Sequence, residues 1–190
     1  MRDPDVGYVQ GINCICAVLL LHMKDEQVIT CGRMGCASLC PICRLSNPTQ
    51  AFWVLCTIMG KYRHRELFLN DQPGLPVLLA RFEALLRFLD DALSSHIASL
   101  GIEIGVHVSQ WFLTIFSYCF TQSATCRVWD AFFVDGRDFL IRFGLVLLLR
   151  HRAELLARDF EGVILFIKGI PESLGENNIG EFISAAYELS

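Results

Sequence analysis

The sequence predicts an all-α fold, and three observations support this prediction. Apolar residues recur at the spacing of amphipathic helices along most of the 190 residues. Asn, Ser, Pro and Gly residues stand where helices commonly begin and end. No segment alternates between apolar and polar residues over a convincing strand length, and no internal repeat is visible.

The composition limits the class of protein. With 53% hydrophobic and 19% charged residues, the chain can form a core of its own, and its length is typical of one domain. The net charge of −4 argues against a nucleic-acid partner bound through its phosphates. The longest apolar stretches, residues 12–21 and 144–149, are shorter than the ~20 residues of a transmembrane helix. Residues 1–5 do not resemble a signal peptide, so we expect a cytoplasmic protein without a transmembrane segment.

Two helices are predicted in the first third of the chain. The first shows a helical period in Ile12, Ile15, Leu19 and Met23. The second is expected to start at Asn47, which can act as a cap, because Pro48 suits the first helical position and Gln50 completes a capping box. We expect Gly60 to end this helix. Its predicted buried stripe consists of Phe52, Leu55, Cys56 and Met59.

Residues 71–76 are predicted to form a loop because they contain two prolines and a glycine. The longest amphipathic pattern follows, with a buried stripe formed by Leu78, Phe82, Leu85, Leu89 and Leu93. Asp90 and the aspartate after it lie off this stripe, so we expect both to be solvated. Ser94 or Ser95 is expected to cap a short helix that ends near Gly101.

Further helical patterns follow in the second half. One stripe contains Val108, Trp111, Phe112, Ile115 and Cys119, and the next contains Val128, Trp129, Phe132 and Phe133. Ser123 is expected to cap the second of these helices, and Gly136 to end it. Residues 160–170 are short and apolar, so periodicity does not decide there between helix and strand. A last helix is predicted after Asn178 from Phe182, Ile183 and Ala186.

Several short motifs occur in an order that resembles the TBC domain, the catalytic module of Rab GTPase-activating proteins. The segment DPDVGYVQGIN at residues 3–13 is similar to the glutamine-finger motif of that family. AFW at 51–53, SQWFLT at 109–114 and RVWD at 127–130 resemble its other segments, and DFEG at 159–162 matches a C-terminal segment of many members. The resemblance covers most of residues 3–168 and implies the all-helical architecture of the TBC domain.

The resemblance implies GTPase activation, with a place in vesicle trafficking. TBC domains supply an arginine and a glutamine in trans to the active site of a Rab-family small GTPase, which is the expected partner. Gln10 matches the glutamine, and its amide has both a donor and an acceptor with which to hold the attacking water. Tyr8 and Gly11 are the expected partner-binding residues: Tyr8 braces the loop, and Gly11 permits a tight backbone. The chain would activate a partner enzyme instead of turning over a substrate of its own.

The remaining motif residues are interpreted as structural, and they are Asn13, Trp53, Trp111, Arg127, Trp129 and Asp130. Asn13 is expected to form a local helix cap, and the spacing of Arg127 and Asp130 allows them to contact each other on one helix face. The five histidines show no ligand spacing, so no metal site is predicted. No cofactor is expected, because GTP and Mg²⁺ belong to the partner. Indirect recruitment to endomembranes through that partner is left open.

The sequence departs from the family pattern in the region before the glutamine motif. The arginine-finger motif, I-x-x-D-x-x-R, and the helices that carry it should precede Tyr8, but Met1 is only seven residues upstream. Arg2 is the only arginine before Gln10, and it lacks the context of that motif. The chain is then a fragment, starts late or is a degenerate member. We therefore expect residues 1–190 to show weak or no activation; the alternative is a catalytically inactive scaffold or effector module that binds a Rab.

A second departure is the stretch of residues 28–50, which intervenes where family members continue almost directly. It contains Cys31, Cys36, Cys40 and Cys43. Cys40 and Cys43 have the spacing of a zinc knuckle, but the two cysteine pairs lie too close together for a usual zinc site. The stretch is expected to be a poorly ordered surface loop or a mis-translated intron. The predicted organisation is a partial TBC domain over residues 1–168, including this insertion, and a C-terminal helical extension over residues 169–190.

Overall fold

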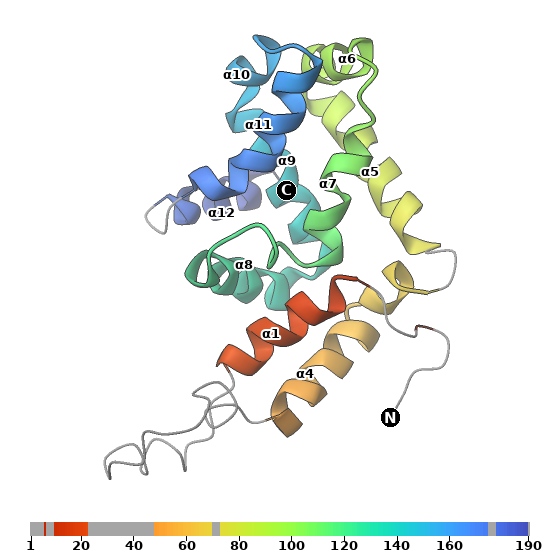
Figure 1. Ribbon diagram of the computed structural model, residues 1–190, viewed down its shortest axis with the longest axis vertical. Helices are drawn as coiled ribbons and strands as arrows, with labels where there is room; N and C mark the ends of the chain where they lie inside the picture. The colour runs from red at the N-terminus through yellow and green to blue at the C-terminus, as the bar shows by residue number, and fades with distance from the viewer. Residues whose placement is uncertain (1–5, 7–9, 23–47, 70–72, 175–177, 190) are drawn as a thin grey trace.

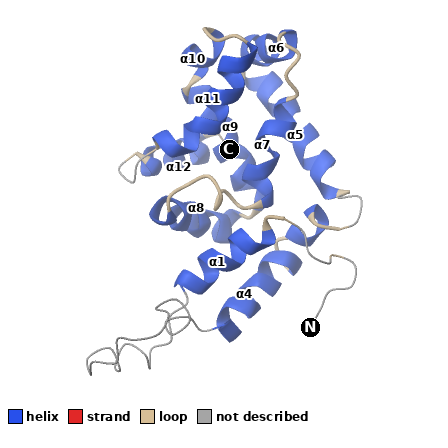
Figure 2. Cartoon of the chain, viewed as in Figure 1, coloured by secondary structure: helices blue, strands red, loops and turns tan. Residues whose placement is uncertain are grey.

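The structure is a computed structural model that describes residues 6, 10–22, 48–69, 73–174 and 178–189. Within these ranges every regular element is a helix (Figure 2), which confirms the predicted all-α class. In chain order the elements are α1 (Ile12–His22), α4 (Pro48–Gly60), the 3₁₀ helix η2 (His64–Leu67), α5 (Gly74–Leu89), α6 (Asp91–Ser99), α7 (Ile104–Leu113), α8 (Gln122–Asp135), α9 (Arg137–Arg150), α10 (Arg152–Leu156), α11 (Phe160–Ser173) and α12 (Ile179–Glu188). The expected insertion lies outside the described residues except for its last three positions.

Helix α9 forms the centre of the core. Between Phe139 and Leu148 every residue except Arg142 is buried, as expected for a helix that is apolar on all sides. It packs against α5, α7, α8, α10 and α12, which surround it in Figure 1. Aromatic rings fill the space between these helices: Phe143 contacts Phe116 with ring centroids 5.1 Å apart and Phe139 with centroids 5.7 Å apart.

Helices α1 and α4 lie side by side at one end of the molecule (Figure 1). The buried residues of α1 are Ile15, Val18 and Leu19. This confirms Ile15 and Leu19 of the predicted period, whereas Ile12 is half-buried and Met23 lies outside the described residues. Helix α4 begins at Pro48, ends at Gly60 as predicted, and also packs against η2. This arrangement brings the start of α1 close to Phe68, the residue that follows η2.

The predicted buried stripe of α4 is confirmed only in part: Leu55 and Met59 are half-buried against the core, but the other two residues are exposed. Ala51 and Ile58 are the buried apolar residues of this helix, whereas Phe52 is 41% exposed and Cys56 is exposed. Nearly every residue of α4 after Gln50 is apolar, so the sequence contains two overlapping stripes of similar strength. The positions of α1 and η2, which periodicity does not report, decide which stripe faces inward.

The predicted loop at residues 71–76 is shorter than expected, because α5 begins at Gly74. Pro76 therefore lies in the first turn of α5, where a missing N–H costs no hydrogen bond. The long apolar pattern that follows is interrupted: α5 ends at Leu89, which is 41% exposed, and α6 starts two residues later.

Asp90 separates these two helices. The prediction that it is solvated is wrong. Its side chain is only 10% exposed, pairs with Arg152, and accepts a 2.9 Å hydrogen bond from the backbone N–H of Leu93. Asp90 is thus the cap of α6, in place of the expected Ser94 or Ser95. Because Arg152 is 62 residues away in the sequence, local pattern could not show this pairing.

Later elements need two smaller corrections. Thr121 caps α8 through a 3.4 Å bond from the N–H of Ala124, so the expected cap at Ser123 is wrong. The stripe that runs to Cys119 does not lie on one helix, because α7 ends at Leu113 and the next turns have positive φ angles. Residues 160–170, left undecided above, form part of α11, and the last helix follows Asn178 as predicted.

Candidate functional site

The predicted glutamine lies directly before α1, where an exposed residue is followed by a buried one. Gln10 is exposed, whereas Gly11 is buried and has a φ of +112°. Side chains other than hydrogen strongly disfavour that backbone conformation, so the position requires glycine. The sharp turn at Gly11 fixes the backbone while it leaves the side chain of Gln10 in solvent. Tyr8 lies outside the described residues, so its expected contact with a partner stays a prediction.

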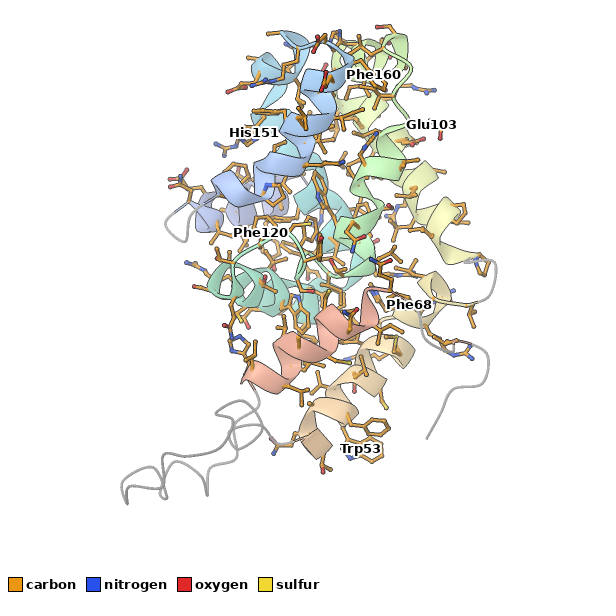
Figure 3. The ribbon with its side chains drawn as sticks, viewed as in Figure 1. Trp53, Phe68, Glu103, Phe120, His151 and Phe160 are labelled. Carbon is orange, nitrogen blue, oxygen red and sulfur yellow. The ribbon has the colours of Figure 1, made fainter. Side chains whose placement is uncertain are left out.

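Two segments distant in the sequence support Gly11. An added Cβ would stand 3.4 Å from Cγ2 of Thr114, 3.7 Å from the carbonyl oxygen of Leu113 and 3.8 Å from Cε1 of Phe68. Leu113 ends α7, and Phe68 follows η2. We call Phe68, Leu113 and Thr114 the seat of Gly11. Figure 3 shows Phe68 near the start of α1, whereas Trp53 lies at the far end of α4.

A local hydrogen bond holds the turn from the α1 side. The N–H of Gly11 donates to Oδ1 of Asn13 at 3.1 Å, and the carbonyl of Gly11 accepts from Cys14 and Ile15 in the first turn of α1. Asn13 is exposed and therefore uses its side chain locally, in the way its position in the motif suggests. Gly11 is thus held by the first turn of α1 on one side and by its seat on the other.

The two buried tryptophans of the motifs lie behind the seat. Trp111 and Trp129 are 2% and 4% exposed. The indole Nε1–H of Trp129 donates to the carbonyl of Ile115 at 2.9 Å, and the ring of Trp111 stacks on Phe116. Ile115 and Phe116 have φ angles of 50° and 60°, and they follow Thr114 directly. The SQWFLT and RVWD segments therefore come together to fix the backbone next to Thr114.

Three motif residues lie away from the seat. Trp53 is 64% exposed and contacts Phe52 edge to face. Arg127 and Asp130 are both exposed on α8. Among the described residues, no ion pair joins these two side chains. The guanidinium of Arg127 instead lies against Gly180 of α12. The structural roles expected for these residues stay predictions.

His64 contributes to the site although the sequence analysis assigned it nothing. Its side chain is fully buried, and its Nε2 lies 3.3 Å from the carbonyl oxygen of Leu113, which belongs to the seat. Burial, aided by the positive charge of Arg137 and opposed by the bond to Leu113, lowers the pKa of His64 from 6.5 to about 4. A lone histidine without ligand spacing carried no signal in the sequence, because its partner is 49 residues away.

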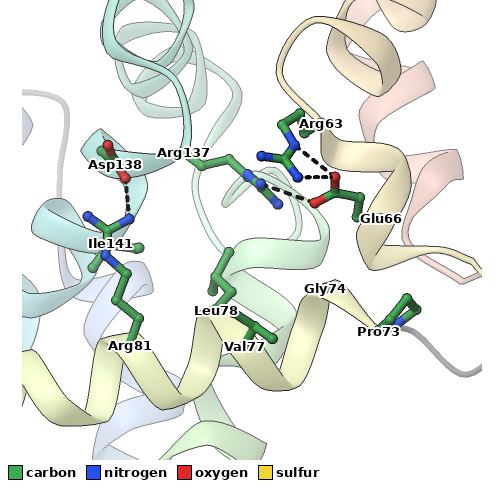
Figure 4. A pocket seen from close by; sticks show the side chains of 10 residues that line it. All are labelled: Arg63, Glu66, Pro73, Gly74, Val77, Leu78, Arg81, Arg137, Asp138 and Ile141. Carbon is green, nitrogen blue, oxygen red and sulfur yellow. Dashed lines mark hydrogen bonds and ion pairs between the residues drawn. The ribbon is translucent and has the colours of Figure 1, made fainter.

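A groove of about 510 Å³ lies next to η2, between α5 and the start of α9 (Figure 4). Glu66 binds Arg63 at 2.7 Å and Arg137 at 3.3 Å, and Arg81 pairs with Asp138 across the groove. Burial alone would raise the pKa of the Glu66 carboxyl, but the hydrogen bond and charge of Arg63, assisted by Arg137, lower it. The groove is thus lined by charges that are already paired with one another.

Within the part of the chain that the structure describes, no cluster of three or more His, Cys, Asp or Glu residues has the geometry of a metal site. The clustered cysteines of the insertion lie outside the described residues. None of the described helices has both the length and the apolar character to cross a bilayer.

Comparisons with known proteins point to one family. The model of the Rab-GTPase-TBC domain matches residues 1–156. The GTPase-activating protein GYP5 of Saccharomyces cerevisiae is 32% identical over 166 residues, which are 87% of this chain and 16% of that protein. The ecotropic viral integration site 5 protein homolog of Homo sapiens is 31% identical over 188 residues, 98% of this chain and 20% of that protein. The chain thus spans a fifth or less of the length of these relatives.

A solved structure shows the same fold. The Ypt/Rab-GAP domain of Gyp1p aligns with a TM-score of 0.77 and 19% sequence identity, over 98% of this chain and 60% of that one. At this level of identity the likeness concerns the helical architecture alone. It agrees with the all-α arrangement around α9.

Proposed function

Because this chain belongs to the Rab-GTPase-TBC domain family, we propose that it is a GTPase-activating module that presents Gln10 to the GTP held by a Rab-type small GTPase. The nucleotide and its Mg²⁺ belong to the partner, so the chain completes an active site located on another protein. The relatives of similar sequence carry the description of GTPase-activating proteins, which supports the same class of activity.

The observation that carries this proposal is the contrast between Gln10 and Gly11. A residue that orients a water must reach out of its own protein, yet its backbone must not move. Gln10 is exposed, and the next residue is buried, hydrogen-bonded to Asn13 and next to the seat, whose residues follow η2 and lie at the end of α7. This arrangement gives one long polar side chain access to a partner while its backbone stays fixed.

The chemistry assigned to Gln10 is the positioning of water. GTP hydrolysis needs an oriented nucleophilic water and neutralisation of the charge that develops on the transferred phosphoryl group. The amide oxygen of Gln10 can accept a hydrogen bond from the water, while its NH₂ group donates to an acceptor on the partner. The pattern I-x-x-D-x-x-R does not occur in these 190 residues. We therefore propose that stimulation by this chain alone is modest, because an arginine in trans contributes about 10³–10⁵ in rate.

The test is single-turnover GTP hydrolysis by a panel of GTP-loaded Rab GTPases, with and without the purified 190-residue chain. We expect modest stimulation of at least one GTPase, and we expect Gln10→Ala to return hydrolysis to the unstimulated rate. Gln122→Ala is the matched control, because Gln122 is exposed and lies close to the other end of α1, where it contacts His22. Stimulation that survives Gln10→Ala would refute the role of Gln10.

The same panel separates activation from simple binding. Binding to a GTP-loaded Rab with no change in hydrolysis, equal for the wild type and Gln10→Ala, would support a scaffold or effector module instead. Binding is measured by surface plasmon resonance with the GTPase in its GTP-analogue and GDP states, so that a preference for the triphosphate form is visible.

A further inference from the structure

We propose that His64 is a positioning residue for Gln10, acting through the carbonyl of Leu113 and the ring of Phe68 on which Gly11 rests. This inference depends on the role proposed above for Gln10. It assigns a part in the presentation of that glutamine to a buried imidazole more than fifty positions away in the sequence.

The carbonyl group at the end of α7 accepts a hydrogen bond from His64. Leu113 is the last residue of this helix, and such a terminal carbonyl has no partner within the helix. The N–H of Ser117 donates to Thr114 instead, and Nε2 of His64 lies 3.3 Å from the oxygen of Leu113. Because a carbonyl oxygen only accepts, Nε2 must carry the proton. His64 therefore serves as a side-chain cap for the C-terminus of α7.

The carbonyl of Leu113 lies close to Gly11. The position where a Cβ on Gly11 would stand is 3.7 Å from the carbonyl oxygen of Leu113 and 3.8 Å from Cε1 of Phe68. The imidazole of His64 also meets the ring of Phe68 edge to face, with centroids 5.5 Å apart. His64 thus contacts two of the three residues of the seat, and the seat lies within 3.8 Å of the place where a Cβ on the residue after Gln10 would stand.

Stability alone does not explain a histidine at position 64. With Nε2 protonated, Nδ1 is a bare acceptor, and it is buried without a hydrogen-bond partner among the residues that the structure describes. A buried polar atom left in this way costs free energy, and an apolar side chain of similar size would avoid that cost. The placement of the donor at Leu113 is therefore what the histidine contributes, at the expense of an unsatisfied nitrogen on its other side.

The experiment compares three variants of the 190-residue chain. His64→Leu removes the donor and keeps an apolar side chain, and His64→Gln keeps an N–H donor. His151→Leu is the matched control, because Nδ1 of His151 lies 2.8 Å from the carbonyl of Leu147 on α9, away from the seat. Hydrogen exchange at the amide of Gly11 reports on the seat directly, and thermal melts exclude global unfolding.

We expect His64→Leu to speed exchange at Gly11 by about fivefold or more, in proportion to the loss of one hydrogen bond, while His64→Gln stays within about twofold of the wild type. His151→Leu should leave this amide unchanged. With the Rab that the wild-type chain stimulates, His64→Leu should lower kcat by about 10-fold with little change in KM, because Gln10 is misplaced and the docking surface is intact. His64→Gln should restore most of the kcat.

The double variant identifies the route of the effect. In the background of Gln10→Ala, His64→Leu should cause no further loss of kcat, because both changes remove the same contribution. In the background of the wild-type Gln10, unchanged kcat in His64→Leu or unchanged exchange at Gly11 would overturn the inference. Stimulation that is insensitive to Gln10→Ala refutes the proposed role of Gln10 instead. Hydrogen exchange needs no GTPase and decides on the seat in either case.

Discussion

The left-handed backbone at Gly11 leads to a quantitative prediction for Gly11→Ala. A non-glycine residue in such a conformation costs on the order of 1–3 kcal/mol, and a φ of +112° lies beyond the region that alanine tolerates best. The added Cβ would stand 3.4 Å from the methyl group of Thr114, at ordinary van der Waals distance, so the cost comes from the backbone conformation. The loss of chain entropy in the unfolded state returns about 0.4–1 kcal/mol. We therefore expect Gly11→Ala to lower the free energy of unfolding by about 1–2 kcal/mol.

Alanine variants at two other glycines serve as references for the cost of the backbone conformation. Gly101 has a φ of +74°, and no atom of the described residues lies within 4 Å of an added Cβ, so Gly101→Ala carries backbone strain alone. Gly169 lies within α11 without positive φ and also faces open space, so Gly169→Ala should be neutral or stabilising by up to about 1 kcal/mol. The expected order of stability is Gly169→Ala above Gly101→Ala above Gly11→Ala.

Urea unfolding followed by circular dichroism measures all three variants under identical conditions, with the free energy taken by linear extrapolation. The structural reasoning predicts that the midpoint falls for Gly11→Ala while the slope stays constant. If Gly11→Ala is as stable as Gly169→Ala, then the turn before α1 is not held in the strained conformation, and the rigid presentation of Gln10 loses its basis.

Two further predictions concern pH and capping. The pKa of His64 is about 4 in the fold and 6.5 in the unfolded chain, so only the unfolded chain gains a proton as the pH drops below 6.5. The free energy of unfolding should thus fall by about 3 kcal/mol between pH 6.5 and pH 4, at about 1.36 kcal/mol per pKa unit. When urea unfolding is repeated at a series of pH values, the stability of His64→Leu should lack this part of the pH dependence. Asp90→Ala should cost about 1 kcal/mol through loss of the cap on α6, and more through the freed Arg152; a melting temperature equal to that of the wild type would contradict the cap.

The sequence predicted those elements whose apolar residues have one dominant period. Helix α12 is an example, because Phe182 and Ala186 of the predicted stripe lie between polar residues such as Glu181 and Ser184 and are buried. Helix α4 is the opposite case, since apolar residues cover nearly all of its surface and only its contacts with α1 and η2 select Ala51 and Ile58. Asp90 shows a second limit: a local pattern places it outside a stripe, but its burial depends on Arg152 in a distant helix.

The candidate site divides in the same way. The motif around Gln10 is contiguous, so it could be identified from the sequence, and its role as a finger remains a prediction from that resemblance. The seat could not be found in this way, because Phe68 and Leu113 are separated from Gly11 by more than fifty residues. His64 carries no signal by itself, and its contact with Leu113 exists only once η2 and the end of α7 have met.

The three motif segments lie together in space, and each supports the next. The glutamine motif supplies the exposed side chain, and the SQWFLT segment supplies Thr114 and the end of α7 beneath it. Trp129 from the RVWD segment then holds the next turn by its bond to Ile115. Each segment alone is too short to fix a backbone, since a strained turn persists only where its surroundings determine it fully. Changes that loosen any of these three layers should therefore lower kcat before they affect binding, because the surface offered to the partner would survive while the orientation of Gln10 would not.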